Sequence, residues 1–149
     1  MKSIISIGLL SLLIIVGCNT EPQALNYGID VCEHCKMVIS DQKFGAEMIT
    51  KKGKIYKFDS AECLIDYISE SINLDKSKDA ELLVINFAKP GVFMDAKTAF
   101  YLEDKGYQSP MGGNLVPFES EMLADNNQIS PGAKVLTFKE ALANISLKW

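Results

Sequence analysis

The chain has 149 residues, with 15 lysine and arginine against 19 aspartate and glutamate residues, which gives a formal net charge of −4. A chain of this length can bury a sizeable hydrophobic core. The acidic balance argues against nucleic acid and anionic lipid as partners, because both recruit basic patches.

The first 17 residues are typical of a bacterial export signal. Lys2 precedes an apolar run from Ile4 to Val16, which is too short for a spanning helix of about 20 residues. The run ends in Gly17 and Cys18, which resembles a lipobox, where a lipid is attached to the Cys and cleavage precedes it. We therefore expect a lipid-anchored protein of the cell envelope, facing the periplasm from the outer membrane. The alternative is an ordinary secretory signal with an incidental Cys18.

Residues 18–30 are polar and lack a clear period, and we interpret them as a tether between the lipid and a folded domain of residues 31–149. This domain contains an internal repeat. The segment Phe44–Met48 matches Phe118–Met122, 74 residues later, and the same offset separates Met37 from Met111. A chance match of short motifs is the alternative to a repeat.

Each copy of the repeat predicts two strands followed by a helix, one beginning at Ala61 and the other at Phe138 with Thr137 as its cap. The fold class is therefore α+β, with two related ββα-type lobes at about residues 31–75 and 80–149. We expect mainly antiparallel strands and two short helices. The predicted strands are residues 44–50, 54–58, 82–87, 98–102, 116–123 and 134–136.

The segment Cys32–Met37 places two thiols, the only histidine of the chain and a thioether within six residues. A second segment, Ser109–Gly113, holds Met111 on a tight turn that Pro110 and two glycines favour. Thiolate and thioether ligands select Cu(I). Packing of the two repeats about a pseudo-two-fold axis would bring Met37 and Met111 together. The pattern predicts a Cu(I) site whose ligand candidates are Cys32, Cys35, Met37 and Met111, with His34 as a further candidate.

Several alternatives remain open at this stage. Cys32, His34, Cys35 and Cys63 are a legitimate Zn(II) set, whereas Cys63 alone is interpreted as a buried small hydrophobe or a third thiol. Cys32 and Cys35 can instead form a disulfide, or act as a thiol–disulfide oxidoreductase. The extended character of residues 37–39 disfavours the redox pair, since that chemistry prefers the first Cys at a helix N-terminus.

Two further interpretations concern catalysis and the core. No nucleophile and base stand out in the sequence, so we predict that the protein is not an enzyme. Met48 and Met122 fall within predicted strands and are interpreted as core residues.

The lipobox, the Cys-x-x-Cys-x-Met of residues 32–37 and the Ser109–Gly112 loop together resemble the NosL family. Residues 58–63 and 93–101 are also similar to its patterns. The family comprises accessory lipoproteins of nitrous oxide reductase maturation. The resemblance implies a two-lobed Cu(I) chaperone that delivers copper to nitrous oxide reductase or another copper acceptor. It also implies that Cys32 or Cys35, Met37 and Met111 are ligands.

Overall fold

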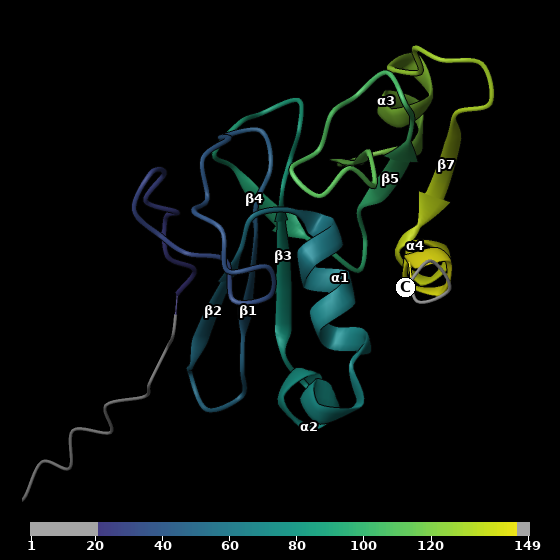
Figure 1. Ribbon diagram of the computed structural model, residues 1–149. Helices are drawn as coiled ribbons and strands as arrows, with labels where there is room; N and C mark the ends of the chain where they lie inside the picture. Colours follow the sequence, from purple (N-terminus) through teal and green to yellow (C-terminus); the bar gives the residue numbers. More distant parts are fainter. Residues whose placement is uncertain (1–20, 146–149) are drawn as a thin grey trace, which may run out of the picture.

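Figure 1 shows the protein as a computed structural model, which describes residues 21–145. The predicted signal peptide and Cys18 lie outside these residues. Within them, no helix combines the length and the apolar character needed to cross a membrane. The elements in chain order are β1 (Ala46–Ile49), β2 (Ile55–Phe58), α1 (Ala61–Ser69), a 3-10 turn (Ser71–Asn73), α2 (Leu74–Ser77), β3 (Glu81–Ile85), β4 (Phe93–Asp95), β5 (Phe100–Glu103), β6 (Leu115–Phe118), α3 (Glu121–Asn126), β7 (Lys134–Thr137) and α4 (Phe138–Ile145).

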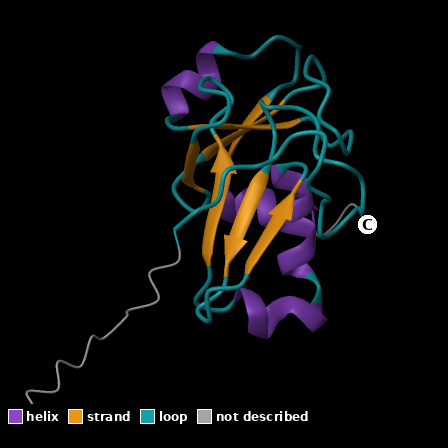
Figure 2. Ribbon diagram, turned by 90° about the vertical axis from the view of Figure 1, so that its left-hand side faces the viewer, coloured by secondary structure: helices purple, strands orange, loops and turns teal. Residues whose placement is uncertain are grey.

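The strands form two antiparallel sheets, which confirms the predicted α+β class. The first sheet has the order β2-β1-β3-β4 and the second has the order β6-β5-β7. The β1–β2 hairpin turns where the sequence predicts it, because Gly53 adopts a φ of +79° and its backbone N–H donates to the Thr50 carbonyl at 2.8 Å. Figure 2 shows helix behind the strands of the first sheet.

Helix α1 covers the inner face of the first sheet and links the two lobes. Its apolar residues, among them Leu64 and Ile65, are fully buried. Helix α4 packs against α1, and it begins with the predicted cap, in which Thr137 and Glu140 exchange hydrogen bonds. Leu136 from the second sheet belongs to the same apolar cluster as Leu64. The two sheets therefore share one core.

The structure contains two units with the same order of elements, but the predicted alignment of their residues is wrong. The units that correspond are β1-β2-α1-β3 and β5-β6-α3-β7, and equivalent serines, Ser60 and Ser120, cap α1 and α3. Residues 121–123, which the sequence predicts as the end of a strand, therefore belong to helix α3. Met48 is buried as predicted, but Met122 is 68% exposed on α3 and is not a core residue. In this register Met111, on the β5–β6 connection, corresponds to the β1–β2 turn and not to Met37.

Three further features differ from the prediction. Strands β3 and β4 pair with β1 and so belong to the first lobe, which ends after Asp95 rather than near residue 75. Helices α2 and α3 are additional to the two that the sequence predicts. The folded part also begins before Val31, because Leu25 is buried and the Gln23 N–H donates to the Glu47 carboxylate.

Candidate metal site

The predicted ligand segment forms a tight loop that is closed by a bridge between Val31 and Val38. Inside the loop the Cys32 N–H donates to the Met37 carbonyl at 2.8 Å, and the Lys36 N–H donates to the Cys32 carbonyl at 3.1 Å. Lys36 adopts a φ of +63°, which reverses the chain direction. These bonds hold the Cys32 and Cys35 thiols close together.

Helix α1 adds a third thiol to this loop. Ser60 caps the helix by accepting a hydrogen bond from the Cys63 N–H at 3.3 Å, which fixes Cys63 in the first turn. The sulfur atoms of Cys32, Cys35 and Cys63 all lie within 4.8 Å of one another. Cys32 and Cys63 are fully buried, Cys35 is partly exposed, and all three thiols are free. We call these three residues the cysteine triad.

The pKa values of the three thiols in the triad are shifted in different directions. A hydrogen bond from the Cys63 thiol, together with the backbone N–H groups of Asp59 and Cys35, holds the pKa of Cys32 well below its usual range. The same bond to Cys32 raises the pKa of Cys63, and burial raises that of Cys35. Burial, followed by repulsion from Cys32, raises the pKa of Asp59 to about 6. The lowered pKa makes Cys32 the thiol of the triad that ionises most readily.

The donor set of the triad fits a soft metal ion. A metal–sulfur bond of about 2.3 Å requires sulfur atoms about 4 Å apart in a trigonal site, which the present spacing reaches with a small contraction. Among residues 21–145, the triad is the group of histidine, cysteine and carboxylate side chains that lies close enough to share an ion. Three sulfurs without a hard oxygen ligand favour Cu(I) over oxygen-seeking cations.

His34 does not point toward the triad. Its ring lies between a carboxylate of helix α1 and one that directly follows the helix, with Nε2 3.8 Å from Asp66 Oδ2 and Nδ1 3.6 Å from Glu70 Oε1. The prediction of His34 as a ligand candidate rests on its position in the sequence. The structure instead places His34 between α1 and the ligand loop.

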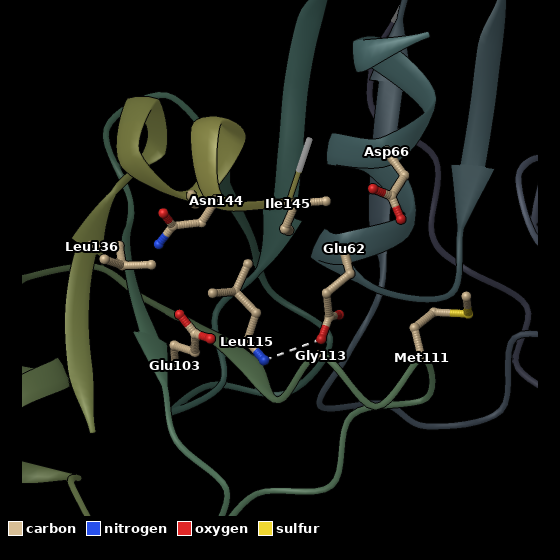
Figure 3. A pocket seen from close by; sticks show the side chains of 10 residues that line it. Glu62, Asp66, Glu103, Met111, Gly113, Leu115, Leu136, Asn144 and Ile145 are labelled. Carbon is tan, nitrogen blue, oxygen red and sulfur yellow. Dashed lines mark hydrogen bonds between the residues drawn. The ribbon is translucent and has the colours of Figure 1, made fainter. Parts of the chain in front are cut away.

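The two predicted methionine ligands lie on two different loops. Met37 follows Cys35 in the loop and is 46% exposed. Met111 lines a pocket against α1, where Figure 3 shows its side chain beside Glu62 and Asp66. Because Asp66 also faces His34, the Met111 loop and the Cys32–Met37 loop meet the same side of the helix.

The Met111 loop is not the freely exposed turn that the sequence predicts. The Glu62 carboxylate is buried and its Oε1 accepts hydrogen bonds from the Ser109 hydroxyl and from the Leu115 N–H at 3.0 Å. Gly113 allows this contact, because a Cβ there would lie 3.0 Å from the Glu62 side chain. Hydrogen bonds to Glu62 therefore hold the loop against helix α1, which also carries Cys63.

A sequence model of the NosL family matches residues 26–145. The chain belongs to the NosL family. Its structure is also similar to the crystal structure of the copper chaperone NosL from Shewanella denitrificans, with 22% sequence identity and a TM-score of 0.70. That match covers 81% of this chain and 95% of the other. A comparison with curated proteins finds no match.

In this NosL protein, Cys63 is the residue of the triad that sequence reasoning left open. Cys63 lies three residues after the cap Ser60 and five residues after the end of β2. The backbone of β2 binds the ligand loop, because the Glu33 N–H donates to the Lys57 carbonyl at 2.8 Å. The sequence predicts a helix that begins at Ala61, and this start places Cys63 in the first helical turn. The pairing between the loop and β2 was not visible, and it is what brings the thiols together.

Proposed function

We propose that this NosL protein is a Cu(I) chaperone of the cell envelope that binds copper through Cys32, Cys35 and Cys63. The convergence of three thiol sulfurs within 4.8 Å is the observation that carries the proposal. The description of the structurally similar Shewanella denitrificans protein as a copper chaperone supports it. In this proposal, lipid on Cys18 anchors the protein to the outer membrane facing the periplasm, and the acceptor is nitrous oxide reductase or another copper protein.

The exposure of the site supports transfer of the ion rather than permanent storage. Cys32 and Cys63 hold the ion from the buried side, while Cys35 and the neighbouring Met37 lie at the surface. A sulfur ligand of the acceptor can approach from that side and bind before Cys35 leaves. We propose Met37 and Met111 as thioether ligands that join the ion during loading and release. Met37 is exposed, and Met111 reaches the same helix as Cys63 from the β5–β6 loop.

Binding rather than catalysis fits the surroundings of the thiols. A redox pair of the thioredoxin type needs its first Cys at a helix N-terminus, whereas Cys32 lies in a bridged loop and Cys63 occupies the helix start. An assay of insulin disulfide reduction tests this point, and turnover at catalytic rates would favour the oxidoreductase alternative.

The first prediction concerns Cys63. We expect an anaerobic titration against a chromogenic Cu(I) chelator to give one Cu(I) per chain, and Cys63→Ser to weaken the affinity at least tenfold, a loss of about 1.4 kcal/mol. The reason is that serine keeps the shape of the side chain but removes a soft ligand. Circular dichroism of both proteins controls for folding. An unchanged affinity in folded Cys63→Ser would remove Cys63 from the site.

The second prediction separates copper from zinc. We expect Met111→Ala to weaken Cu(I) binding and to leave Zn(II) binding nearly unchanged, because a thioether offers Zn(II) little. Met122→Ala is a matched control, since Met122 lies exposed on α3. Equal Cu(I) affinities in the two variants would exclude Met111 as a ligand. Tighter binding of Zn(II) than of Cu(I) by the unmodified protein would favour the structural or sensing zinc alternative.

Delivery and anchoring need separate tests. Copper transfer is measured by mixing the Cu(I)-loaded protein with a copper-free acceptor, nitrous oxide reductase first, and following the absorbance of the acceptor's copper centre. Anchoring is measured by membrane fractionation of cells that produce the full chain or Cys18→Ala. We expect the variant to leave the membrane fraction, and its retention there would contradict lipid attachment at Cys18.

A further inference from the structure

One end of this acidic protein is strongly basic. Five lysines line an open hollow of about 450 Å³ between the β1–β2 turn and α2, together with two aspartates. All five lysines are exposed. We call this group the lysine end; it consists of Lys51, Lys52, Lys54, Lys76 and Lys78. Although the whole chain has a negative net charge, the lysine end therefore carries a local excess of positive charge.

Aromatic residues form the floor of the lysine end and shape it. The Lys54 ammonium lies 4.4 Å from the centre of the Tyr56 ring, and Lys76 lies 5.8 Å from that of Tyr67. These contacts hold both ammonium groups over the ring faces. Lys51 pairs loosely with Asp79 at 3.9 Å, an exposed contact of little energetic weight. The hollow thus presents positive charge to a broad negatively charged surface.

Few residues separate Cys18, the proposed lipid attachment point, from the folded domain. Gln23 follows Cys18 by five residue steps, with four residues between them, and its N–H donates to Glu47 on β1. A chain of five residues spans at most about 17 Å. The β1–β2 turn begins only three residues after Glu47, about 10 Å along the strand. With the proposed anchor at Cys18, a short link therefore joins the membrane to β1 at a point about 10 Å along the strand from the turn that carries Lys51 and Lys52.

We propose that the lysine end binds the anionic headgroups of the membrane that carries the protein, and so fixes the orientation of the domain on that membrane. This inference rests on the proposed lipid anchor at Cys18. Clusters of lysines next to a membrane attachment point bind anionic lipid headgroups in this way. The earlier expectation that anionic lipid is not a partner considered only the total charge, and here the distribution of charge outweighs the total.

The orientation has a consequence for the metal site. Helix α1 begins at the cysteine triad and runs for about 13 Å toward α2, and Figure 1 shows α2 and the β1–β2 turn at the same end of the molecule. The triad lies at the opposite end of α1 from the lysine end. When the lysines contact the membrane, the triad faces away from it, toward an acceptor.

The experiment measures the rate at which each lysine is acylated by an amine-reactive ester, read by mass spectrometry, in lipidated protein reconstituted into vesicles. We expect the five lysines to react at least threefold more slowly in phosphatidylcholine vesicles with about 30% phosphatidylglycerol than in pure phosphatidylcholine. The protection should vanish in about 1 M NaCl, where the Debye length falls to about 3 Å. Lys105, Lys134 and Lys139, exposed on the second lobe, serve as internal references with unchanged rates.

Two charge-matched variants sharpen the test. The triple variant Lys51→Gln, Lys52→Gln and Lys78→Gln should lose the protection of Lys54 and Lys76 while its Cu(I) affinity stays unchanged. The triple variant of the three reference lysines removes the same charge and should retain the protection. Equal acylation of the lysine end in both kinds of vesicle would overturn the proposal. Slower acylation only in the presence of the copper acceptor would overturn it in favour of a protein partner.

The anchor is tested separately from the lysine end in the same preparation. The mass of the peptide that contains Cys18 shows whether lipid is attached. If it carries no lipid, the anchor proposal fails. Sedimentation of the same protein with the two kinds of vesicle then tests whether the lysine end binds anionic headgroups without an anchor. Sedimentation only with the anionic vesicles would support the lysine end, and sedimentation with neither would overturn it.

Discussion

At the scale of single residues, the unequal ionisation of the triad makes copper binding depend on pH in a defined way. The pKa of Cys32 is lowered by the Cys63 thiol and by backbone N–H groups, so we expect Cys32 to be the thiolate of the triad at neutral pH. The pKa values of Cys35 and Cys63 are raised, so both are protonated there. Binding of a metal by all three sulfurs must therefore release two protons.

The third prediction follows from this count. Between pH 6 and pH 8 the Cu(I) affinity should rise about a hundredfold per pH unit, because two protons leave as the ion binds. Chelator competition at several pH values, corrected for protonation of the chelator, gives the slope. A thousandfold rise per unit would mean that Cys32 is protonated before copper binds. A tenfold rise would mean that only two sulfurs reach the ion.

The same residues show how far a sequence can specify a site. Cys32 and Cys35 were predicted because two thiols three residues apart must lie close together in almost any loop. His34 stays a prediction, because adjacency along the chain says nothing about side-chain direction, and the structure places its ring 3.8 Å from Asp66. Cys63 falls among the apolar residues of α1, where a small buried thiol cannot be told from a core residue by periodicity alone.

At the scale of secondary structure elements, the serine caps of α1 and α3 form a natural pair. Each serine accepts a hydrogen bond from the backbone three residues on, at 3.3 Å in both helices. Only α1 carries a proposed metal ligand, Cys63, in its first turn. Loss of the cap should therefore affect stability in both helices but the metal site in only one.

The fourth prediction compares Ser60→Ala with Ser120→Ala. Each should lower the free energy of unfolding by about 1 kcal/mol, the usual contribution of a serine cap. Only Ser60→Ala should also weaken Cu(I) binding, because Cys63 loses the bond that fixes its backbone. Urea unfolding and Cu(I) titration of the two variants provide the comparison. Equal copper affinities would show that the cap does not position Cys63.

The caps also explain why the register of the repeat was wrong. The match between Phe44–Met48 and Phe118–Met122 covers five residues, too few to distinguish a strand from a helix. In the second segment Ser120 caps a helix, and the chain leaves the sheet after Phe118. The match of Phe58 and Ser60 with Phe118 and Ser120 was present in the sequence, and it gives the register that the structure shows.

At the scale of the whole molecule, the division into lobes does not follow the chain as simply as the sequence suggested. Strand β3 completes the first sheet by pairing with β1, although more than 30 residues separate them. Local patterns identified β3 as a strand but could not name its partner. The α+β class and the antiparallel sheets were predictable, because strand and helix periodicity are local properties. The sharing of one core between the lobes depends on contacts across α1 and α4.

The fifth prediction tests whether the shared core makes the protein a single cooperative unit. Leu136 lies on β7 in the second sheet and is 8% exposed within the cluster that contains Leu64 of α1. Leu136→Ala should cost about 2–3 kcal/mol through lost burial and a residual cavity. If the core is shared, this change must also destabilise the first lobe, where Cys63 is buried. Circular dichroism in urea reports the whole fold, and alkylation of Cys63, read by mass spectrometry, reports the first lobe. Both midpoints should fall together, whereas an unchanged midpoint for Cys63 alkylation would show that the lobes unfold independently.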